Sequence, residues 1–260
     1  MKKIIIFIIL SLSLIACGSS EPKYSNLGDE NSKEILNKLF EKNKLDNFEI
    51  LLKNIEAFNS TNEKNIVTSW KKLKFGPTDP SQFNEDYTKT NNHLNCRESV
   101  ALSILNSIEV KEESEKGTYL MFDSQEIKSF PELKNINPCK FFGLFNEIDA
   151  KNIEEKDLKT FLQKALDSKN IHFKNTNVKT VFAYIYDKYD QVLFVGHAGI
   201  LMEDQNSKGF YFFEKLSYYE PYQLTYFKNK SQLIKLLKSR YTFNDDVKEP
   251  IIVMDGQVLE

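Results

Sequence analysis

A cysteine with the local sequence of a reactive thiol stands in the first half of the chain. Cys96 follows Asn95 and is followed by Arg97 and Glu98. Asn95 and Glu98 have the spacing of a capping box, so a helix is predicted to begin at Cys96. The positive end of the helix dipole and the unpaired N–H groups of the first turn favour a thiolate there. Cys96 is therefore a candidate nucleophile.

The base that a cysteine nucleophile needs is predicted to be His197, one of three histidines in the chain. It lies in the strand-like run 192–202 and is flanked by Gly196 and Gly199. Glycines in a strand allow another backbone or a substrate to approach closely. An imidazole in this position can take the proton of the thiol.

The residue that orients the histidine is predicted to be Glu214. A second strand-like run, 210–216, follows a polar turn. A hairpin centred near residues 205 and 206 places Glu214 opposite His197 on the neighbouring strand. A carboxylate there holds the ring in one orientation and one tautomer, as the third member of a catalytic triad does. The less favoured alternatives, beyond the predicted strand, are Glu220 and Gln223.

These residues predict a thiol hydrolase. Cys96 is expected to attack an amide or thioester carbonyl, with His197 first accepting its proton and then donating one to the leaving group. The N–H of Cys96 and a donor from the preceding loop are expected to hold the oxyanion. The side chains expected to contact the substrate are Asn92 and Asn95, close to the cysteine, and Tyr222, in a tyrosine-rich stretch.

The constellation resembles the NlpC-type branch of the papain-like cysteine peptidases. There the nucleophile opens a buried helix, the base begins a following strand, and a polar residue of the next strand orients the base. The resemblance rests on residues 95–108 and 194–216. It departs at Asn95, where these enzymes usually have Asp, and at Arg97-Glu98, where they usually have Ser-Gly. It implies a papain-like α+β fold, with a buried Cys helix on a small antiparallel sheet, and a cell-wall or other short peptide as substrate.

A narrower resemblance rests on three short motifs in the second half of the chain. They are Gly196-His197-Ala198-Gly199-Ile200, Phe213-Glu214-Lys215-Leu216 and Glu220-Pro221-Tyr222-Gln223. Together they resemble domain-of-unknown-function family 4300, a group of bacterial lipoproteins. The resemblance implies a protein of the cell envelope.

The start of the chain predicts export and lipid attachment. Two lysines precede an apolar run over 4–16, which is shorter than the roughly 18 residues that a spanning helix needs. Leu14-Ile15-Ala16-Cys17 resembles a lipobox, which implies that Cys17 carries the lipid. We therefore expect a signal peptide over 1–16, a tether over 17–30, and anchoring to a membrane outside the cytoplasm.

The remainder is predicted to form one α+β domain with an N-terminal helical extension. Apolar residues at helical spacing over 31–75 predict three helices, the last of them over 66–73. From 76 to 260, helical and strand-like runs are mixed, and one further strand is expected over 119–122. This pattern is typical of helices packed on an antiparallel sheet.

Composition argues against two classes of partner. The 35 basic and 37 acidic residues give a net charge of −2, and lysines are interspersed with acidic residues, so no nucleic-acid partner is expected. No CxxC or HxxxH spacing occurs in the chain, so neither a metal site nor a cofactor is predicted.

The two cysteines of the exported chain leave an alternative open. An even number of cysteines outside the cytoplasm is typical of a disulfide, so Cys96 and Cys139 are candidates for a structural bridge or for two unconnected thiols. The protein is then expected to be a lipid-anchored binding or scaffold protein. The position of Cys96 at a helix N-terminus favours the catalytic interpretation, since a bridge has no need of it.

Overall fold

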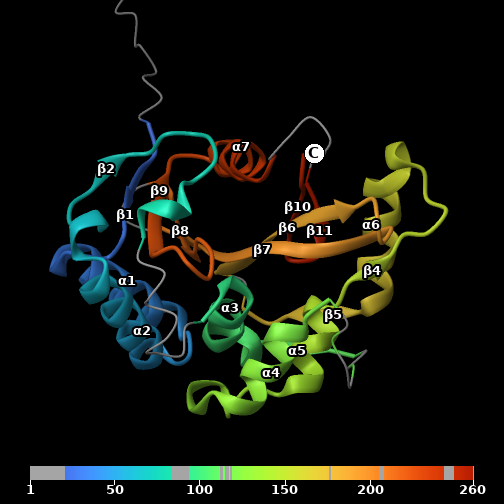
Figure 1. Cartoon of the computed structure of the whole chain (residues 1–260), viewed down its shortest axis with the longest axis horizontal. Coiled ribbons are helices and arrows are strands. Elements are labelled where there is room, and N and C mark those ends of the chain that lie inside the picture. Colours follow the sequence, from blue (N-terminus) through green and yellow to red (C-terminus); the bar gives the residue numbers. More distant parts are fainter. Residues whose placement is uncertain are drawn as a thin grey trace, which may run out of the picture.

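Figure 1 shows the computed structural model of the chain, which describes residues 21–83, 94–111, 114, 117, 119–175, 177–204, 208–242 and 249–259. The expected signal peptide, the expected lipid site at Cys17 and the expected substrate contact at Asn92 lie outside these residues. Among the described residues there is no helix with the length and hydropathy of a membrane-spanning segment.

The centre of the molecule is an antiparallel sheet, larger than the small sheet expected, to which both ends of the described chain contribute. In spatial order its strands are β11 (Gln257–Val258), β10 (Ile251–Met254), β6 (Val178–Asp187), β7 (Val192–Glu203), β8 (Phe210–Lys215), β9 (Tyr222–Phe227), β1 (Lys23–Ser25) and β2 (Lys71–Lys72), and β4 (Ile148–Asp149) pairs with β7. A separate pair is formed by β3 (Ile108–Val110) and β5 (Ile171–Phe173). The expected α+β class is confirmed.

Helices cover both faces of this sheet. They are α1 (Glu30–Asn43), α2 (Phe48–Thr61), α3 (Cys96–Ile104), α4 (Met121–Ser129), α5 (Pro138–Phe145), α6 (Leu158–Lys169) and α7 (Lys230–Tyr241). In Figure 1, α7 lies on one side of the sheet and α3, α4 and α5 lie on the other. Leu201 of β7 packs in the core under α7, whereas Ala198 and Ile200 pack in the core under α3. Successive residues of β7 therefore serve two separate cores.

α3 is a buried helix that begins at Cys96, as predicted. The Asn95 side chain accepts the backbone N–H groups of Arg97 and Glu98, and Glu98 Oε2 accepts the N–H of Asn95 at 2.9 Å. Both halves of the capping box are thus present. Behind it, the residues from Glu98 to Ile104 are buried, because the helix packs between the sheet and the other helices.

The N-terminal region differs from the expected tether and three helices. Lys23–Ser25 forms β1 and pairs with β9, so this part of the expected tether belongs to the sheet. The third helix expected over 66–73 is wrong, since this stretch contains β2, which pairs with β1. A strand partner at the sheet edge satisfies backbone groups that an isolated helical turn would leave to water, and this tertiary contact overrides the local pattern.

The strand expected over 119–122 is also wrong, because α4 begins at Met121. Its apolar run of four residues is too short to distinguish a strand from the start of a helix. The helix places Asp123 and Glu126 against the N-terminus of α3. This contact bears directly on the cysteine.

β7 leaves a short stretch of its edge open, and α3 fills it. Along this edge of β7, β8 pairs with Gly199–Glu203 and β4 pairs with Val192 and Leu193. No described strand pairs with the residues of β7 that lie between them. There the carbonyl of Val195 accepts Arg97 Nη1 at 3.0 Å, and the N–H of Ala198 donates to the thiol of Cys96. The first turn of α3 thus takes the place of a strand partner.

The two glycines beside His197 serve packing within the protein. A Cβ at Gly196 would lie 2.3 Å from the side chain of Ile185, and one at Gly199 would lie 2.3 Å from the ring of Phe212. Neither distance is compatible with a side chain at these positions unless the neighbours move. The close approach that the glycines allow is therefore used by core side chains.

Replacing Phe213 with alanine is expected to lower the free energy of unfolding by about 3–5 kcal/mol, the usual cost of emptying a buried phenylalanine site. Phe213 is 2% exposed, and its ring centre lies 5.8 Å from that of Phe40 on α1 and 5.7 Å from that of Tyr222. Urea unfolding measures the change. The control is Phe122→Ala, because that ring is 75% exposed and its loss should cost under about 0.5 kcal/mol. Equal losses would contradict this packing.

Candidate active site

Cys96, His197 and Glu214 come together at the N-terminus of α3, although they lie on three different elements. The thiol of Cys96 is hydrogen-bonded to His197. His197 Nε2 lies 2.7 Å from Glu214 Oε2, so Nδ1 is the ring nitrogen left for the thiol. Cys96 is 7% exposed, and the other two residues are 1% exposed each. The three predicted catalytic residues therefore form one continuous, buried line of contacts.

Glu214 reaches His197 in a register that differs by two residues from the predicted one. Glu214 pairs with Gly199 of β7 instead of standing opposite His197. A shift of two residues keeps a side chain on the same face of a sheet, whereas a shift of one moves it to the other face. The carboxylate consequently still projects on the α7 face, diagonally across from the imidazole.

Two residues at the end of α7 complete the surroundings of this line, and sequence analysis missed both. Arg240 Nη1 donates to both carboxylate oxygens of Glu214 at 2.9 Å. The ring of Tyr241 stacks on the imidazole of His197, with ring centres 4.8 Å apart and planes inclined by 25°. The one available signal was charge balance, because a carboxylate within an apolar strand needs a buried cation. Charge balance predicts that Glu214 has a cationic partner, but it does not identify Arg240 as that partner.

The two alternatives to Glu214 take other places. Gln223 Nε2 lies 3.4 Å from Glu214 Oε1 and donates to Thr225 Oγ1 at 2.9 Å, so it supports the carboxylate. Glu220 is 3% exposed, and its Oε1 has no hydrogen-bond partner among the described residues. His197 therefore receives its orienting contact from Glu214.

The charges around Cys96 favour a thiolate paired with an imidazolium. Burial on its own raises the pKa of the Cys96 thiol. The hydrogen bond and charge of His197, the charge of Arg97 and the N–H of Ala198 outweigh burial and hold that pKa below its ordinary value. Burial lowers the pKa of His197, but its hydrogen bonds to Cys96 and Glu214 raise it to about 9. Each partner thus stabilises the charged form of the other.

Arg240 keeps the carboxylate of this line ionised. Burial raises the pKa of Glu214, but the charge of Arg240 and the hydrogen bond with His197 bring it below its usual range. The side chains of Glu214 and Arg240 are 0% and 4% exposed. The contacts along the line therefore favour alternating charges on the guanidinium, the carboxylate, the imidazole and the thiol.

The N–H of Cys96 is the donor best placed to hold an oxyanion. The cap uses the N–H groups of the next two residues and leaves the N–H at the first helical position unused. Asn95 itself, expected to contact the substrate, has its oxygen in the cap, and its amide donates to Asp123 Oδ1 at 2.6 Å. Asn95 thus positions the first turn of the helix.

Tyr222, the other described residue expected to contact the substrate, is a core residue. It is 1% exposed, its hydroxyl lies 3.1 Å from Ser99 Oγ, and its ring stacks on Phe213. This placement leaves no face of the ring for a ligand. Tyr222 instead holds α3 against β9.

Lys215 is a buried cation beside the thiol that sequence analysis did not single out. Its Nζ lies 4.1 Å from the ring centre of Phe58 and 5.2 Å from that of Tyr222, and it donates to the carbonyl of Glu220. Burial lowers the pKa of Lys215 to about 7. With Cys96 it lines a gap too small to hold a water molecule. Its charged form adds to the positive potential that favours the thiolate.

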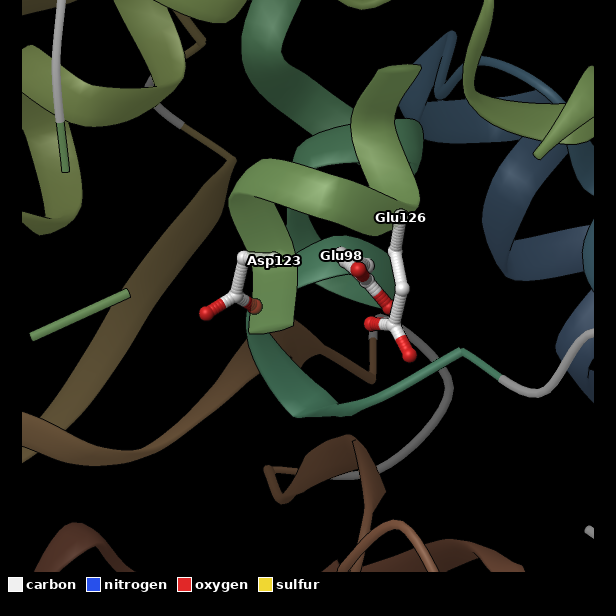
Figure 2. Close-up of side chains that lie close together, drawn as sticks. All are labelled: Glu98, Asp123 and Glu126. Atoms are coloured by element: carbon white, nitrogen blue, oxygen red, sulfur yellow. The ribbon is translucent and has the colours of Figure 1, made fainter. Parts of the chain in front are cut away.

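Three carboxylates, those of Glu98, Asp123 and Glu126, gather near the N-terminus of α3 (Figure 2). Glu98 and Glu126 point toward one another, and Asp123 lies to one side. Asp123 already accepts Arg97 Nη2 at 2.7 Å and the amide of Asn95. A metal ion bound here would therefore face the guanidinium of Arg97, so the three carboxylates fit a metal ion poorly.

The positions of Glu98 and Glu126 instead suit two carboxyl groups that share one proton. Burial, followed by the hydrogen bond with Glu126, raises the pKa of Glu98 well above its usual range. Burial also raises the pKa of Glu126. Ionising both of two carboxyl groups this close is energetically unfavourable, so one keeps its proton and donates a hydrogen bond to the other. This acid pair fastens α4 to the turn that carries Cys96.

Comparison with known proteins gives one match that spans nearly the whole described chain. The family model described as "Domain of unknown function (DUF4300)" matches residues 23–259. No curated protein and no solved structure matches the chain. The matched range begins at β1, which agrees with the place of this strand in the sheet.

Replacing Glu98 with glutamine is expected to flatten the pH dependence of stability. Because the folded pKa of Glu98 lies above its unfolded value, its stabilising effect is complete below about pH 4.5 and is lost as pH rises through the folded pKa. The amide of the Glu98→Gln variant still accepts the N–H of Asn95 and donates to Glu126 at any pH. At pH 8 the variant should be about 1–2 kcal/mol more stable than the wild type, with a smaller difference at pH 5.

Urea unfolding at the two pH values measures this effect. Glu203→Gln is the control, because Glu203 is exposed at the end of β7 and its substitution removes the same charge from the surface. A Glu98→Gln variant that follows the wild-type pH dependence would show that the acid pair holds no proton.

Proposed function

Because the chain belongs to the DUF4300 family, whose description names no activity, we propose its function from the site itself. The protein is a thiol hydrolase of amide bonds, in which Cys96 is the nucleophile, His197 the acid and base, and Glu214 the residue that orients His197. One observation carries the proposal: a buried line of contacts runs from Arg240 through Glu214 and His197 to Cys96, and it lowers the pKa of the thiol. A structural cysteine has no need of such a line.

The reaction follows from the protonation states of this line. The thiolate of Cys96 attacks the carbonyl carbon and forms a C–S bond. The oxyanion that results accepts a hydrogen bond from the backbone N–H of Cys96. His197 gives its proton to the leaving nitrogen as the C–N bond breaks, which leaves a thioester and a neutral imidazole. The imidazole then takes a proton from water, whose oxygen attacks the thioester. The C–S bond then breaks, the carboxylic acid leaves, and Cys96 and His197 return to their initial states.

The setting of the reaction rests on the sequence. The resemblance of Leu14-Ile15-Ala16-Cys17 to a lipobox supports a lipid on Cys17 and anchoring to a membrane outside the cytoplasm. The resemblance of the site to NlpC-type enzymes supports a cell-wall peptide or another short peptide as substrate. The order of nucleophile, base and orienter along the chain is the same in both.

A second candidate is a lipid-anchored binding protein without thiol chemistry. The observation in its favour is the closure of the site, since Cys96 is 7% exposed and the gap beside it is too small for a water molecule. Cys96 and Cys139 are both free thiols in the structure, so this candidate does not draw support from a bridge between them.

Thiol alkylation distinguishes the two candidates. Cys96 in the full chain is labelled with iodoacetamide between pH 5 and pH 10, without reductant, and the modified peptide is quantified by mass spectrometry. The midpoint of labelling should lie below the free-thiol value of about 8.5. In His197→Gln it should rise by a unit or more, because the imidazolium is lost while burial remains.

Two controls belong to this experiment. His172→Gln removes an exposed histidine on β5 and should leave the midpoint unchanged. Cys139, half-buried in the same chain, reports general access of the reagent. An equal midpoint in wild type and His197→Gln, or a Cys96–Cys139 cross-linked peptide that reacts only after reduction, would favour the binding protein.

A further inference from the structure

A polar cleft of about 650 Å³ opens beside the site and is used by no step of the reaction described above. One wall is formed by residues 71–79, which comprise β2 and the segment after it. The other wall is formed by the β8–β9 turn, β9 and the end of α7. Its volume lies in the range of pockets that hold small ligands or peptide segments.

The walls of the cleft carry an excess of positive charge. The exposed lysines in them are Lys64, Lys71, Lys72 and Lys74, whereas the charge of Arg240, which also lines the cleft, is paired with Glu214. Lys72 also pairs with Glu21, at 2.7 Å. The acidic residues of the lining are Asp79 and Glu220. The cleft therefore attracts an anion, although the chain as a whole is slightly acidic.

One buried carboxylate oxygen of the lining lacks a hydrogen-bond donor. Glu220 is 3% exposed, and its Oε1 accepts no hydrogen bond within the described part of the chain. Buried polar atoms are normally satisfied, and a peptide offers a backbone N–H for this oxygen.

The cleft shares side chains with the catalytic line. Gln223 and Arg240 line the cleft, and both contact the carboxylate of Glu214. Leu216 and Glu220 also line it, and they flank the turn that holds Lys215 beside Cys96. A ligand in the cleft therefore lies against the residues that support the imidazole.

We propose, resting on the thiol hydrolase function, that this cleft is the substrate subsite and that it selects peptides bearing carboxylate groups. The lysines of the 64–74 segment bind the carboxylates, and Glu220 accepts a backbone N–H of the same peptide. Because the lysines are exposed and long, they act through charge more than through fixed geometry, so recognition depends on ionic strength.

Peptide binding to the full chain carrying Cys96→Ala tests the proposal without any turnover. The probes are two fluorescein-labelled hexapeptides of alternating alanine and glutamate, or alanine and glutamine, read by fluorescence anisotropy at low and high salt. The glutamate peptide should bind at least tenfold more tightly at low salt. Replacing Lys64, Lys71 and Lys74 together with glutamine should remove this preference.

A matched triple variant controls for net charge. Lys53, Lys159 and Lys228 are exposed lysines outside the cleft, and replacing them with glutamine removes the same charge. This variant should keep the preference for the glutamate peptide. Equal affinity for the two peptides, or the same loss in both triple variants, would overturn the subsite.

Failure of the subsite and failure of the hydrolase give different results. Charge-selective binding together with an ordinary Cys96 labelling midpoint would leave a cleft that binds acidic peptides in a protein without thiol chemistry, and so would overturn its role as a substrate subsite. A lowered labelling midpoint with no peptide preference would retain the thiol enzyme and overturn the subsite alone.

Discussion

The carboxylate of Glu214 has almost no exposed surface, and the arrangement around it keeps it ionised. An isolated buried carboxylate is costly, so it persists only with charged and hydrogen-bonding partners on every side. Arg240 supplies the cation from α7, His197 supplies the second contact from β7, and Gln223 supports it from β9. The position of α7 over the sheet and the protonation of the imidazole both follow from this one requirement. The lowered pKa of the Cys96 thiol is a further consequence of the same arrangement.

The open edge of β7 explains how a cysteine on one face of the sheet meets a histidine on the other. A continuous row of strand partners would separate the two faces along its whole length. Here the strand pairing stops beside His197, and the first turn of α3 enters the gap through the contacts of Arg97 with Val195 and of Cys96 with Ala198. The helix N-terminus thus completes the sheet and delivers the thiol at the same time. Arg97 makes this connection between the helix and the open edge of β7.

Buried charged groups also surround the line of contacts that runs from Arg240 to Cys96. Lys215 lies between Phe58 and Tyr222, and the acid pair of Glu98 and Glu126 lies close to the start of α3. Each group is held by partners from separate elements, which ties α2, α4 and β8 to the turn at Cys96. Such groups contribute little net stability, because desolvation offsets their attraction. Their effect is to fix the position of the thiol and the local potential.

Local sequence was enough for the features that depend on neighbours in the chain. The spacing of Asn95 and Glu98 determined the start of α3, and the alternation of β8 determined the face on which Glu214 lies even though the register was two residues away from the prediction. Tertiary structure alone decided the rest. Arg240, Lys215 and Glu126 enter the site from elements whose order in space is not written in any local pattern, and β1 and β2 became strands because a sheet edge was there to pair with them. Caps and alternation act over a few residues, whereas buried charges are paired by the packing of distant elements.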